Sequence, residues 1–145
     1  MKRYLFLVAV VLLAILSSCE KDGLEYVDPL IGTEGEGTEY GGLMPYIGVP
    51  FGSAQWTPMT RLNDVSRLSY NAADTLLLGF IGSRQPAIWM GDWGQVSFMA
   101  QKEDALTDYA DRGLRIESEK YTPYSGNVTA GGISTRFAAL EHSAV

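Results

Sequence analysis

The sequence is poor in the residues on which many catalytic sites depend. Its 145 residues include one histidine, His142, and one cysteine, Cys19. A histidine-rich zinc site therefore cannot be built, and a Ser-His-Asp triad would have to use His142, close to the end of the chain. We do not expect His142 to be catalytic.

Positive charge is also scarce. The chain has 11 basic and 17 acidic residues, which gives a formal net charge of −6. Binding to nucleic-acid phosphates needs a basic patch, so a nucleic-acid partner is not expected. Charged residues amount to 19% and hydrophobic residues to 46% of the chain, a balance that argues against intrinsic disorder. The length suits one domain with a hydrophobic core.

No apolar run is long enough to span a bilayer, which takes about 20 residues. The longest runs from Tyr4 to Leu16, thirteen residues, and follows the basic pair Lys2 and Arg3. A short apolar stretch behind a positive start is typical of a secretory signal peptide. We assign residues 1–18 to this signal.

The signal ends at Leu16-Ser17-Ser18-Cys19, which resembles a bacterial lipobox. In that interpretation Cys19 becomes the first residue of the mature chain and carries acyl chains that anchor it in lipid. An ordinary signal peptide with an incidental cysteine is the alternative. With Cys19 acylated, no thiol remains for a disulfide, a metal site or a nucleophile.

Residues 19–25 are interpreted as a tether. The stretch Glu20-Lys21-Asp22-Gly23 resembles the acidic surface-export signals of Bacteroidetes lipoproteins, or is a plain solvated spacer. The first alternative predicts a lipid-anchored protein of the cell envelope, exposed on the outer face of the outer membrane.

The rest of the chain, residues 26–145, is predicted to be one all-β domain. Residues 24–60 are too rich in glycine and proline for long helices, and short apolar runs there predict brief strands or extended segments. Those runs are Tyr26-Val27, Leu30-Ile31 and Ala54-Gln55-Trp56. Only Glu103 to Arg115 has room for a helical turn or two.

Later runs carry clearer strand signals. Residues 76–80 are apolar, residues 95–100 alternate with a period of two, and Gly131-Gly132 separates two strand-like runs as in a hairpin. In the second arm Ile133, Thr135, Phe137 and Ala139 share one face. The predicted fold is an antiparallel β-sandwich, incomplete at its C-terminus because the last run continues to Val145.

An acidic loop at residues 34–41 is the first candidate binding site. Its Gly35-Glu36-Gly37-Thr38-Glu39-Tyr40-Gly41 lacks the spacing of a dinucleotide loop, and its glutamates would repel a pyrophosphate. Glu34, Glu36 and Glu39 offer oxygen ligands for calcium, but they do not match the twelve-residue calcium loop. Solvated loop charges are the favoured interpretation.

The segment from Gly82 to Gln95 is the strongest candidate site. It packs two tryptophans, an arginine, a glutamine and an aspartate among glycines and a proline. A sugar presents an apolar face that stacks on tryptophan and hydroxyls that pair with polar side chains. The predicted carbohydrate-binding residues are Arg84, Gln85, Trp89, Asp92 and Trp93. Alternatively, Trp89 and Trp93 fill the core while Asp92 caps a turn.

Three ordered segments resemble the N-terminal domain of glycoside hydrolase family 92. They are Tyr26-Val27-Asp28-Pro29-Leu30-Ile31-Gly32-Thr33, then Val49-Pro50-Phe51-Gly52-Ser53-Ala54-Gln55-Trp56-Thr57-Pro58, then Leu78-Gly79-Phe80 leading into residues 84–94. The resemblance covers nearly the whole mature chain. Members of this family are exo-acting α-mannosidases that trim mannose from N-glycans and mannans.

The resemblance implies a β-sandwich that packs on a larger, C-terminal (α/α)6 barrel, which is absent from this sequence. The barrel would supply the catalytic acid, the catalytic base and the calcium ligands, with inversion at the anomeric carbon. This chain would then hold no catalytic residue and would be inactive alone, while Trp89, Asp92 and Trp93 help to shape the mannose pocket. Many relatives have a histidine where this chain has Arg84, which bears on sugar selection. A free-standing carbohydrate-binding surface lipoprotein is the alternative function.

Overall fold

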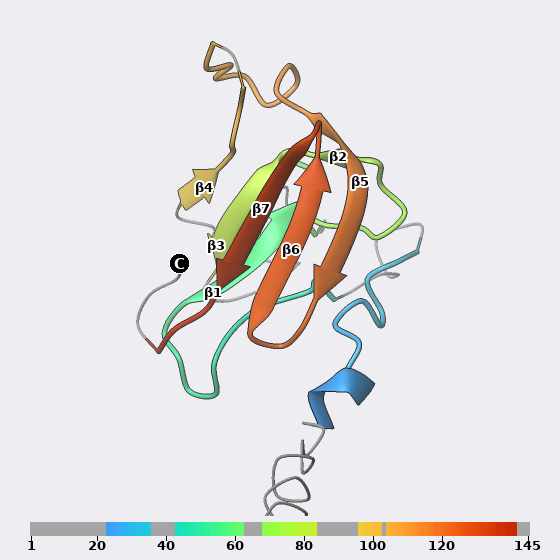
Figure 1. Cartoon of the computed structure of the whole chain (residues 1–145), viewed down its shortest axis with the longest axis vertical. Helices are drawn as coiled ribbons and strands as arrows, with labels where there is room; N and C mark the ends of the chain where they lie inside the picture. Colours follow the sequence, from blue (N-terminus) through green and yellow to red (C-terminus); the bar gives the residue numbers. More distant parts are fainter. Residues whose placement is uncertain (1–22, 36–42, 63–67, 84–95, 103, 142–145) are drawn as a thin grey trace, which may run out of the picture.

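Figure 1 shows the computed structural model of the chain, which describes residues 23–35, 43–62, 68–83, 96–102 and 104–141. These residues form one short 3-10 helix and seven β-strands. The helix η1 is Gly23–Tyr26, and the strands are β1 Gln55–Met59, β2 Leu76–Leu77, β3 Gly79–Ser83, β4 Val96–Phe98, β5 Leu114–Tyr121, β6 Ser125–Ala130 and β7 Ile133–Ala138.

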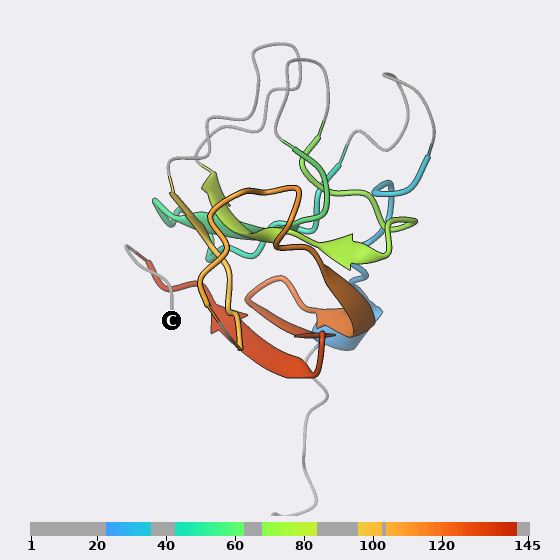
Figure 2. The same ribbon diagram turned by 90° about the horizontal axis from the view of Figure 1, so that it is seen from above.

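The strands form two antiparallel sheets. One has the order β1-β3-β4, and the other has the order β2-β5-β6-β7. Figure 2 shows the sheets as two layers, with β1 and β3 on one side and the β5-β6-β7 sheet on the other. The predicted all-β antiparallel sandwich is confirmed.

One continuous run of chain belongs to both sheets. Leu76 and Leu77 in β2 pair with β5, whereas β3 pairs with β1 from Gly79 onward. Gly79 has a φ of 149°, in the range that favours glycine, and a Cβ there would lie 2.7 Å from the carbonyl oxygen of Phe98. Glycine therefore allows the strand to turn the corner from one sheet to the other.

The core lies between the two layers. The aromatic ring of Phe80 in β3 packs on that of Phe137 in β7, with 4.8 Å between the ring centroids, and this contact joins the two sheets. The buried members of the core are Ile47, Leu77, Phe80, Tyr121, Val128, Ala130 and Ala139. Burying one large apolar side chain of this kind contributes about 1.5–3 kcal/mol to stability.

The three-stranded sheet is buried on its other face as well. Thr57, Met59 and Ile81 alternate with the core-facing residues along β1 and β3, and their exposed fractions are 0%, 2% and 5%. A sheet covered on both faces has no need of polar alternation. This explains why residues 79–81 at the start of β3 show no polar alternation.

The hairpin of β6 and β7 follows the sequence prediction closely. Gly131 and Gly132 have φ values of 55° and 69°, as the two central residues of a type I′ turn require, and Ala130 pairs with Ile133. Ile133, Thr135 and Phe137 are partly buried, while the residues between them are exposed. However, β7 ends at Ala138, and residues 140–141 are not in a strand.

The predicted helical turns between Glu103 and Arg115 are wrong over the described residues. Residues 104–113 form bends and turns, and β5 begins at Leu114. The side chain of Gln101 bonds both the N–H and the carbonyl oxygen of Leu106, and Asp108 accepts a hydrogen bond from the N–H of Ala110. Such local side-chain bonds compete with helix formation.

Two of the three short runs predicted near the N-terminus are not extended. Tyr26 ends η1, and Leu30 and Ile31 lie in turns. The Asp28 carboxylate accepts a hydrogen bond from the N–H of Leu30 at 2.9 Å, and the Leu30 carbonyl accepts one from the N–H of Thr33. Aspartate followed by proline favours such a turn over a strand. The third run is confirmed, because β1 begins at Gln55.

Candidate functional site

The described residues include the base of the predicted carbohydrate site, by which we mean the ends of β3 and β4 that flank residues 84–95. Arg84, Gln85, Trp89, Asp92 and Trp93 themselves lie outside the described residues, as do Cys19 and His142. Residues 84–95 connect two neighbouring antiparallel strands, because β3 ends at Ser83, β4 begins at Val96, and Gly82 pairs with Val96. The connection thus leaves and re-enters the sheet at one end of β3 and β4.

Aromatic rings gather at this base. Trp56 in β1 pairs with Gly82, and its ring lies over that glycine, where a Cβ would be only 3.4 Å from Cζ2 of the indole. The ring of Phe98 in β4 lies 5.5 Å from that of Trp56, and Phe98 is 59% exposed. The sheet therefore presents the exposed ring of Phe98 against Trp56, which itself packs on the hydrophobic core.

The sequence analysis did not single out the Trp56–Phe98 pair. Trp56 lies in one of the segments that carry the family resemblance, and Phe98 lies in the alternating run of residues 95–100. Each signal was visible, but only the register of β1, β3 and β4 places the two residues on the same face of the sheet.

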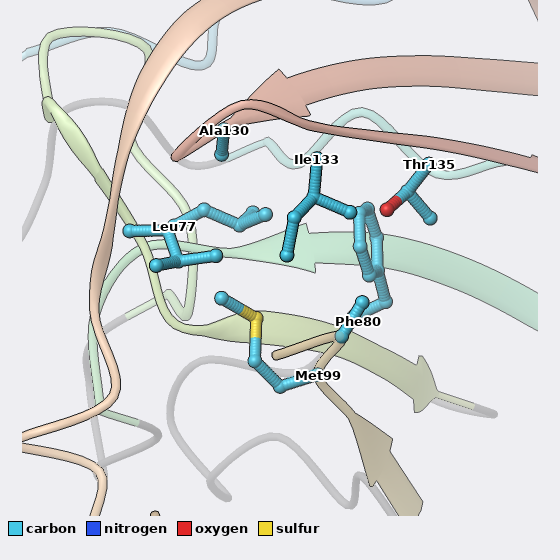
Figure 3. Close-up of a pocket in the computed structure, with 8 residues that line it drawn as sticks. Leu77, Phe80, Met99, Ala130, Ile133 and Thr135 are labelled. Atoms are coloured by element: carbon cyan, nitrogen blue, oxygen red, sulfur yellow. The ribbon is translucent and has the colours of Figure 1, made fainter. Parts of the chain in front are cut away.

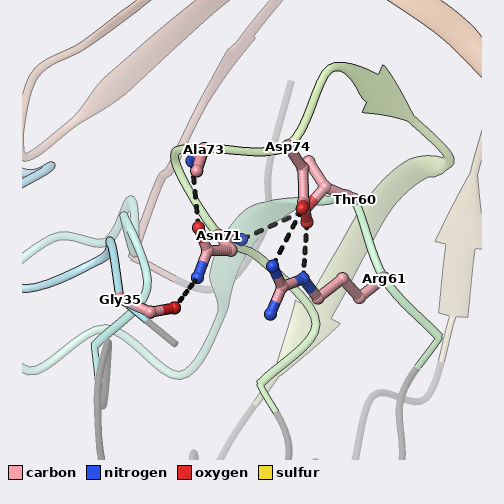
Figure 4. Close-up of polar contacts among 6 residues, drawn as sticks. All are labelled: Gly35, Thr60, Arg61, Asn71, Ala73 and Asp74. Atoms are coloured by element: carbon pink, nitrogen blue, oxygen red, sulfur yellow. Dashed lines mark hydrogen bonds and ion pairs between the residues drawn. The ribbon is translucent and has the colours of Figure 1, made fainter. Parts of the chain in front are cut away.

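A polar network lies at the opposite end of β1 and β3 (Figure 4). The Arg61 guanidinium donates two hydrogen bonds to the Asp74 carboxylate, at 2.7 and 2.9 Å, and the Thr60 hydroxyl donates a third at 2.7 Å. The hydrogen bond to Asp74 raises the pKa of Arg61. With three donors around it, Asp74 is a structural acceptor.

Asn71 extends this network to the N-terminal part of the chain. Its side-chain amide donates to the carbonyl of Gly35 at 2.9 Å, its side-chain oxygen accepts from the N–H of Ala73, and its own N–H donates to the Thr60 hydroxyl. Asn71 is 4% exposed, so each of these bonds is shielded from water. The network holds three loops together, and the pairing of β1 with β3 separates it from the base of residues 84–95.

A second carboxylate, which is partly buried, is held by two tyrosines. Glu119 in β5 accepts hydrogen bonds from the hydroxyls of Tyr70 and Tyr121, both at 2.8 Å. Burial, assisted by the carboxylate, raises the pKa of both tyrosines, so that the hydroxyls stay protonated and act as donors. This cluster ties the segment before β2 to the end of β5 and has the character of a structural bridge.

The described residues do not fit a calcium site. Among them, no group of three or more histidine, cysteine, aspartate or glutamate side chains could hold a metal ion. Of the three loop glutamates considered above, only Glu34 is described, and it is exposed.

Within the described residues, no helix has the length and apolar character needed to cross a membrane.

An apolar pocket opens between the layers (Figure 3). Side chains from both sheets and from the chain after β4 line it: Leu77, Phe80, Met99, Ala100, Leu114, Ala130, Ile133 and Thr135. It leaves no room for a water molecule. The pocket is a narrow gap in the packing of the core and not a ligand site.

Comparison with known proteins agrees with the fold. Residues 26–145 match the glycosyl hydrolase family 92 N-terminal domain, whereas no curated protein matches the chain. A solved structure of the Family GH92 inverting mannosidase BT2199 from Bacteroides thetaiotaomicron VPI-5482 is similar, with a TM-score of 0.75 and 31% identity over 85% of this chain. The family GH92 α-mannosidase BT3965 from Bacteroides thetaiotaomicron shares the fold, with a TM-score of 0.56 and 19% identity over 81% of this chain.

The match is to a small part of each solved relative. This chain covers 17% of the length of either mannosidase. The matched region nevertheless includes every described strand and the predicted carbohydrate-binding segment. The chain therefore belongs to glycoside hydrolase family 92, of which it carries the N-terminal domain.

Proposed function

We propose that this chain is the N-terminal part of an exo-acting, calcium-dependent, inverting α-mannosidase that acts on N-glycans or mannans. The observation that carries the proposal is the 31% identity with an inverting mannosidase over 85% of this chain. The similarity covers 17% of that enzyme, so the activity is proposed for a full-length protein with a C-terminal domain.

The chemistry divides between the two domains. An inverting glycosidase needs a carboxylic acid and a carboxylate about 6.5–9.5 Å apart, with a water molecule between them. In the part of the chain that the structure describes, Asp74 and Glu119 are each engaged by two or more donors and belong to structural networks. We assign the acid, the base and the calcium ligands to the C-terminal domain.

The N-terminal domain contributes side chains to the mannose pocket. Trp89 and Trp93 offer stacking surfaces, while Arg84, Gln85 and Asp92 offer hydrogen bonds to hydroxyls. The rigid strands β3 and β4 hold both ends of this segment, and binding loops on rigid scaffolds keep their geometry. These residues position the sugar without transferring a proton, and the 145-residue chain alone should hydrolyse nothing.

Steady-state kinetics of the full-length protein on an α-mannobioside tests this division. Each stacking contact or charge-assisted hydrogen bond contributes about 1–3 kcal/mol, so Trp89→Ala or Asp92→Ala should lower kcat/KM by roughly 5- to 150-fold. Thermal melts of the same variants separate misfolding from lost contacts. Wild-type kinetics in both variants would remove these residues from the sugar site.

The stereochemistry and the metal requirement are tested separately. Proton NMR early in the reaction should show the β-anomer of mannose as the first product, because inversion converts an α-linkage into a β-product. Treatment with a chelator should abolish activity, and added calcium should restore it. A first product of retained configuration would refute the inverting mechanism.

A free-standing carbohydrate-binding lipoprotein is the second candidate. The exposed ring of Phe98, backed by Trp56, favours it, because an exposed aromatic ring suits the apolar face of a sugar without a catalytic domain. The two candidates differ in the genomic reading frame. Continuation past Val145 into a long helical region rich in aspartate and glutamate supports the enzyme, and a stop codon there supports the binding protein.

The proposed location follows from the start of the chain. Residues 1–18 would be removed as a signal peptide, Cys19 would carry the lipid, and residues 19–25 would tether the domain of residues 26–145 to the outer membrane, facing outward. Metabolic labelling with a palmitate analogue should tag the wild-type protein and not Cys19→Ala. Equal labelling of the two would refute lipidation, and protease treatment of intact cells tests surface exposure.

A further inference from the structure

The outer face of the four-stranded sheet is basic, although the chain is acidic. Strands β2, β5, β6 and β7 contain three basic residues, Arg115, Lys120 and Arg136, and all three are exposed. The chain as a whole carries a formal net charge of −6. A surface of the opposite sign to the rest of the molecule attracts anions.

Lys120 and Arg136 lie on the same side of this sheet. Both pair with Asn127 in the middle strand β6. Residues directly opposite one another in antiparallel strands share a face, and Asn127 is exposed while its neighbour Val128 is buried in the core. Lys120, Asn127 and Arg136 therefore form a row on the outer face, which Figure 2 shows as the side away from β1 and β3. Neighbouring strands are about 4.8 Å apart, so the backbones of the two cations are about 10 Å apart.

Arg115 extends this basic surface along β5. It pairs with Leu76, which is 47% exposed, whereas the adjacent pair of Leu77 and Leu114 packs in the core. At about 3.3 Å per residue, the strand places Arg115 about 16 Å from Lys120. We call the outer surface that carries Arg115, Lys120 and Arg136 the basic face.

The acidic residues of the same strands have partners within the domain. Both are in β5. Glu119 accepts hydrogen bonds from the hydroxyls of Tyr70 and Tyr121 on the core side. Glu117 accepts one from the N–H of Gly132 at 2.7 Å, at the hairpin turn. Each carboxylate is thus engaged in a hydrogen bond that stabilises the fold.

The other arginines that the structure describes also have structural roles. Arg61 is bound by Asp74. Arg112 donates to the carbonyl of Leu78 and stacks on Tyr109, with 3.9 Å between Cζ and the centroid of the ring. Among the described residues, the arginines that remain for an external partner are those of the basic face.

We propose that the basic face lies against an anionic lipid surface, that of the membrane to which the proposed anchor at Cys19 attaches the chain. Tyr26, the last residue of η1, follows Cys19 by seven positions, so even an extended tether keeps it within about 25 Å of the lipid. Figure 1 shows η1 beyond the end of β5, the strand that carries Arg115 and Lys120. The tether therefore keeps the basic face close to the headgroups.

The shape of the basic face favours a lipid surface over an anionic glycan. Sugar sites are concave and offer aromatic rings. The outer positions between the cations instead carry short polar side chains, those of Ser118, Asn127, Thr129 and Ser134. Cations spread over a flat area of about 10 by 16 Å suit an array of headgroups, because a single small anion would reach only one of them.

Vesicle binding by the full-length protein tests the basic face. Because the inference rests on the proposed lipid anchor, the protein is used with Cys19→Ser, which removes the anchor. At low salt it should bind vesicles of equal parts phosphatidylcholine and phosphatidylglycerol but not vesicles of phosphatidylcholine alone, and added salt should weaken the binding. Each basic residue near an anionic membrane contributes about fivefold, so Arg115→Gln, Lys120→Gln and Arg136→Gln should each lower the partition coefficient about fivefold and together about 100-fold.

Arg61→Gln is the matched control. It removes one positive charge next to β1 in the other sheet, so it should lower the partition coefficient less than any of the three single variants does. Equal binding to the two kinds of vesicle, or wild-type binding by the triple variant, would overturn the inference. So would binding to a soluble uronate polysaccharide without binding to vesicles, because that result identifies a glycan as the partner. Palmitate labelling and mannosidase assays report on the anchor and on the proposed function independently.

Thiol accessibility in the anchored protein provides a second measurement. On the anionic vesicles, maleimide should label Asn127→Cys, in the middle of the basic face, several-fold more slowly than Leu62→Cys, a position in the other layer that is 58% exposed. Mass spectrometry of the labelled peptides measures both rates, and detergent should restore fast labelling at position 127. Equal rates on vesicles would overturn the inference. Slow labelling that persists in detergent would also overturn it, because another part of the protein would then cover the basic face.

Discussion

Residues 114–138 and residues 23–62 reach their structure in different ways. The first region consists of β5, β6 and β7 in antiparallel pairing, with one shift of register in β5 and with apolar side chains turned to the core. The described residues of the second contain the 3-10 helix η1 and one strand, β1, and are otherwise ordered by turns and by individual hydrogen bonds. The comparison teaches that this sandwich has a patterned layer, stabilised by burial, and a turn-rich part whose shape depends on particular residues.

The largest expected effect is at the contact between the patterned layer and the other sheet. Phe80→Ala removes the ring that packs on Phe137 and leaves a cavity between the sheets, so the free energy of unfolding should fall by about 3–5 kcal/mol. Urea denaturation of the protein measures the loss. Phe98→Ala, which removes a ring that is 59% exposed, is the matched control and should cost about 1 kcal/mol or less. Equal losses would mean that burial between the sheets is not what stabilises the patterned layer.

The second prediction concerns the bridge between the patterned layer and the segment before β2. Glu119→Ala leaves the hydroxyls of Tyr70 and Tyr121 without their acceptor, at a cost of about 1–3 kcal/mol for each buried unsatisfied group. Replacing all three side chains together, as Glu119→Leu with both tyrosines changed to phenylalanine, should recover most of this loss. A triple variant as unstable as Glu119→Ala would argue against unsatisfied hydroxyls as the cause.

The third prediction tests the turn of the patterned layer. Gly131→Ala forces a residue with a Cβ to a φ of 55° and brings that Cβ to 2.9 Å from Cδ2 of Leu114, so the stability loss should be about 1–2 kcal/mol. Gly132→Ala meets only the flexible end of Lys102, so it should cost less. Hydrogen exchange of the β6 and β7 amides measures both, and the reverse ranking would contradict the role of Leu114.

The smallest effect is expected in the turn-rich part of the molecule. Arg61 is 45% exposed, and Arg61→Ala should lower stability by only about 0.2–1 kcal/mol, with less effect in high salt. Asp74→Ala should cost more, because Thr60, which is 7% exposed, loses its acceptor as well. Chemical denaturation at two salt concentrations checks both variants. A larger loss of stability in Arg61→Ala than in Asp74→Ala would contradict the role of Asp74 as the acceptor shared by Arg61 and Thr60.

The features that sequence could predict are those with a local cause. Alternation and Gly131-Gly132 predict the hairpin, and the glycine and proline content excludes long helices in residues 24–60. The inward position of Glu119 could not be predicted, because it follows a shift of register between Ile116 and Ser118 that only pairing with β6 defines. The predictions of an extended run near residues 28–31 and of helical turns within residues 104–113 were wrong, because aspartate and glutamine side chains there bond to nearby backbone groups.

The candidate site also has one part that the sequence predicts and one part that it does not. Residue chemistry singles out Arg84, Gln85, Trp89, Asp92 and Trp93, and their role remains a prediction because they lie outside the described residues. The Trp56–Phe98 pair depends on three strands brought together from distant parts of the sequence. No single-sequence pattern encodes that alignment, since each strand is short and the spacing between them is irregular.

The corner at Gly79 has a mechanical consequence. Because only Leu78 separates β2 from β3, a force that pulls β2 away with its sheet is transmitted directly to the middle strand of the other sheet. The sandwich should therefore open as a single cooperative unit, and a change of pressure or load on one layer would be felt at the strands that hold residues 84–95.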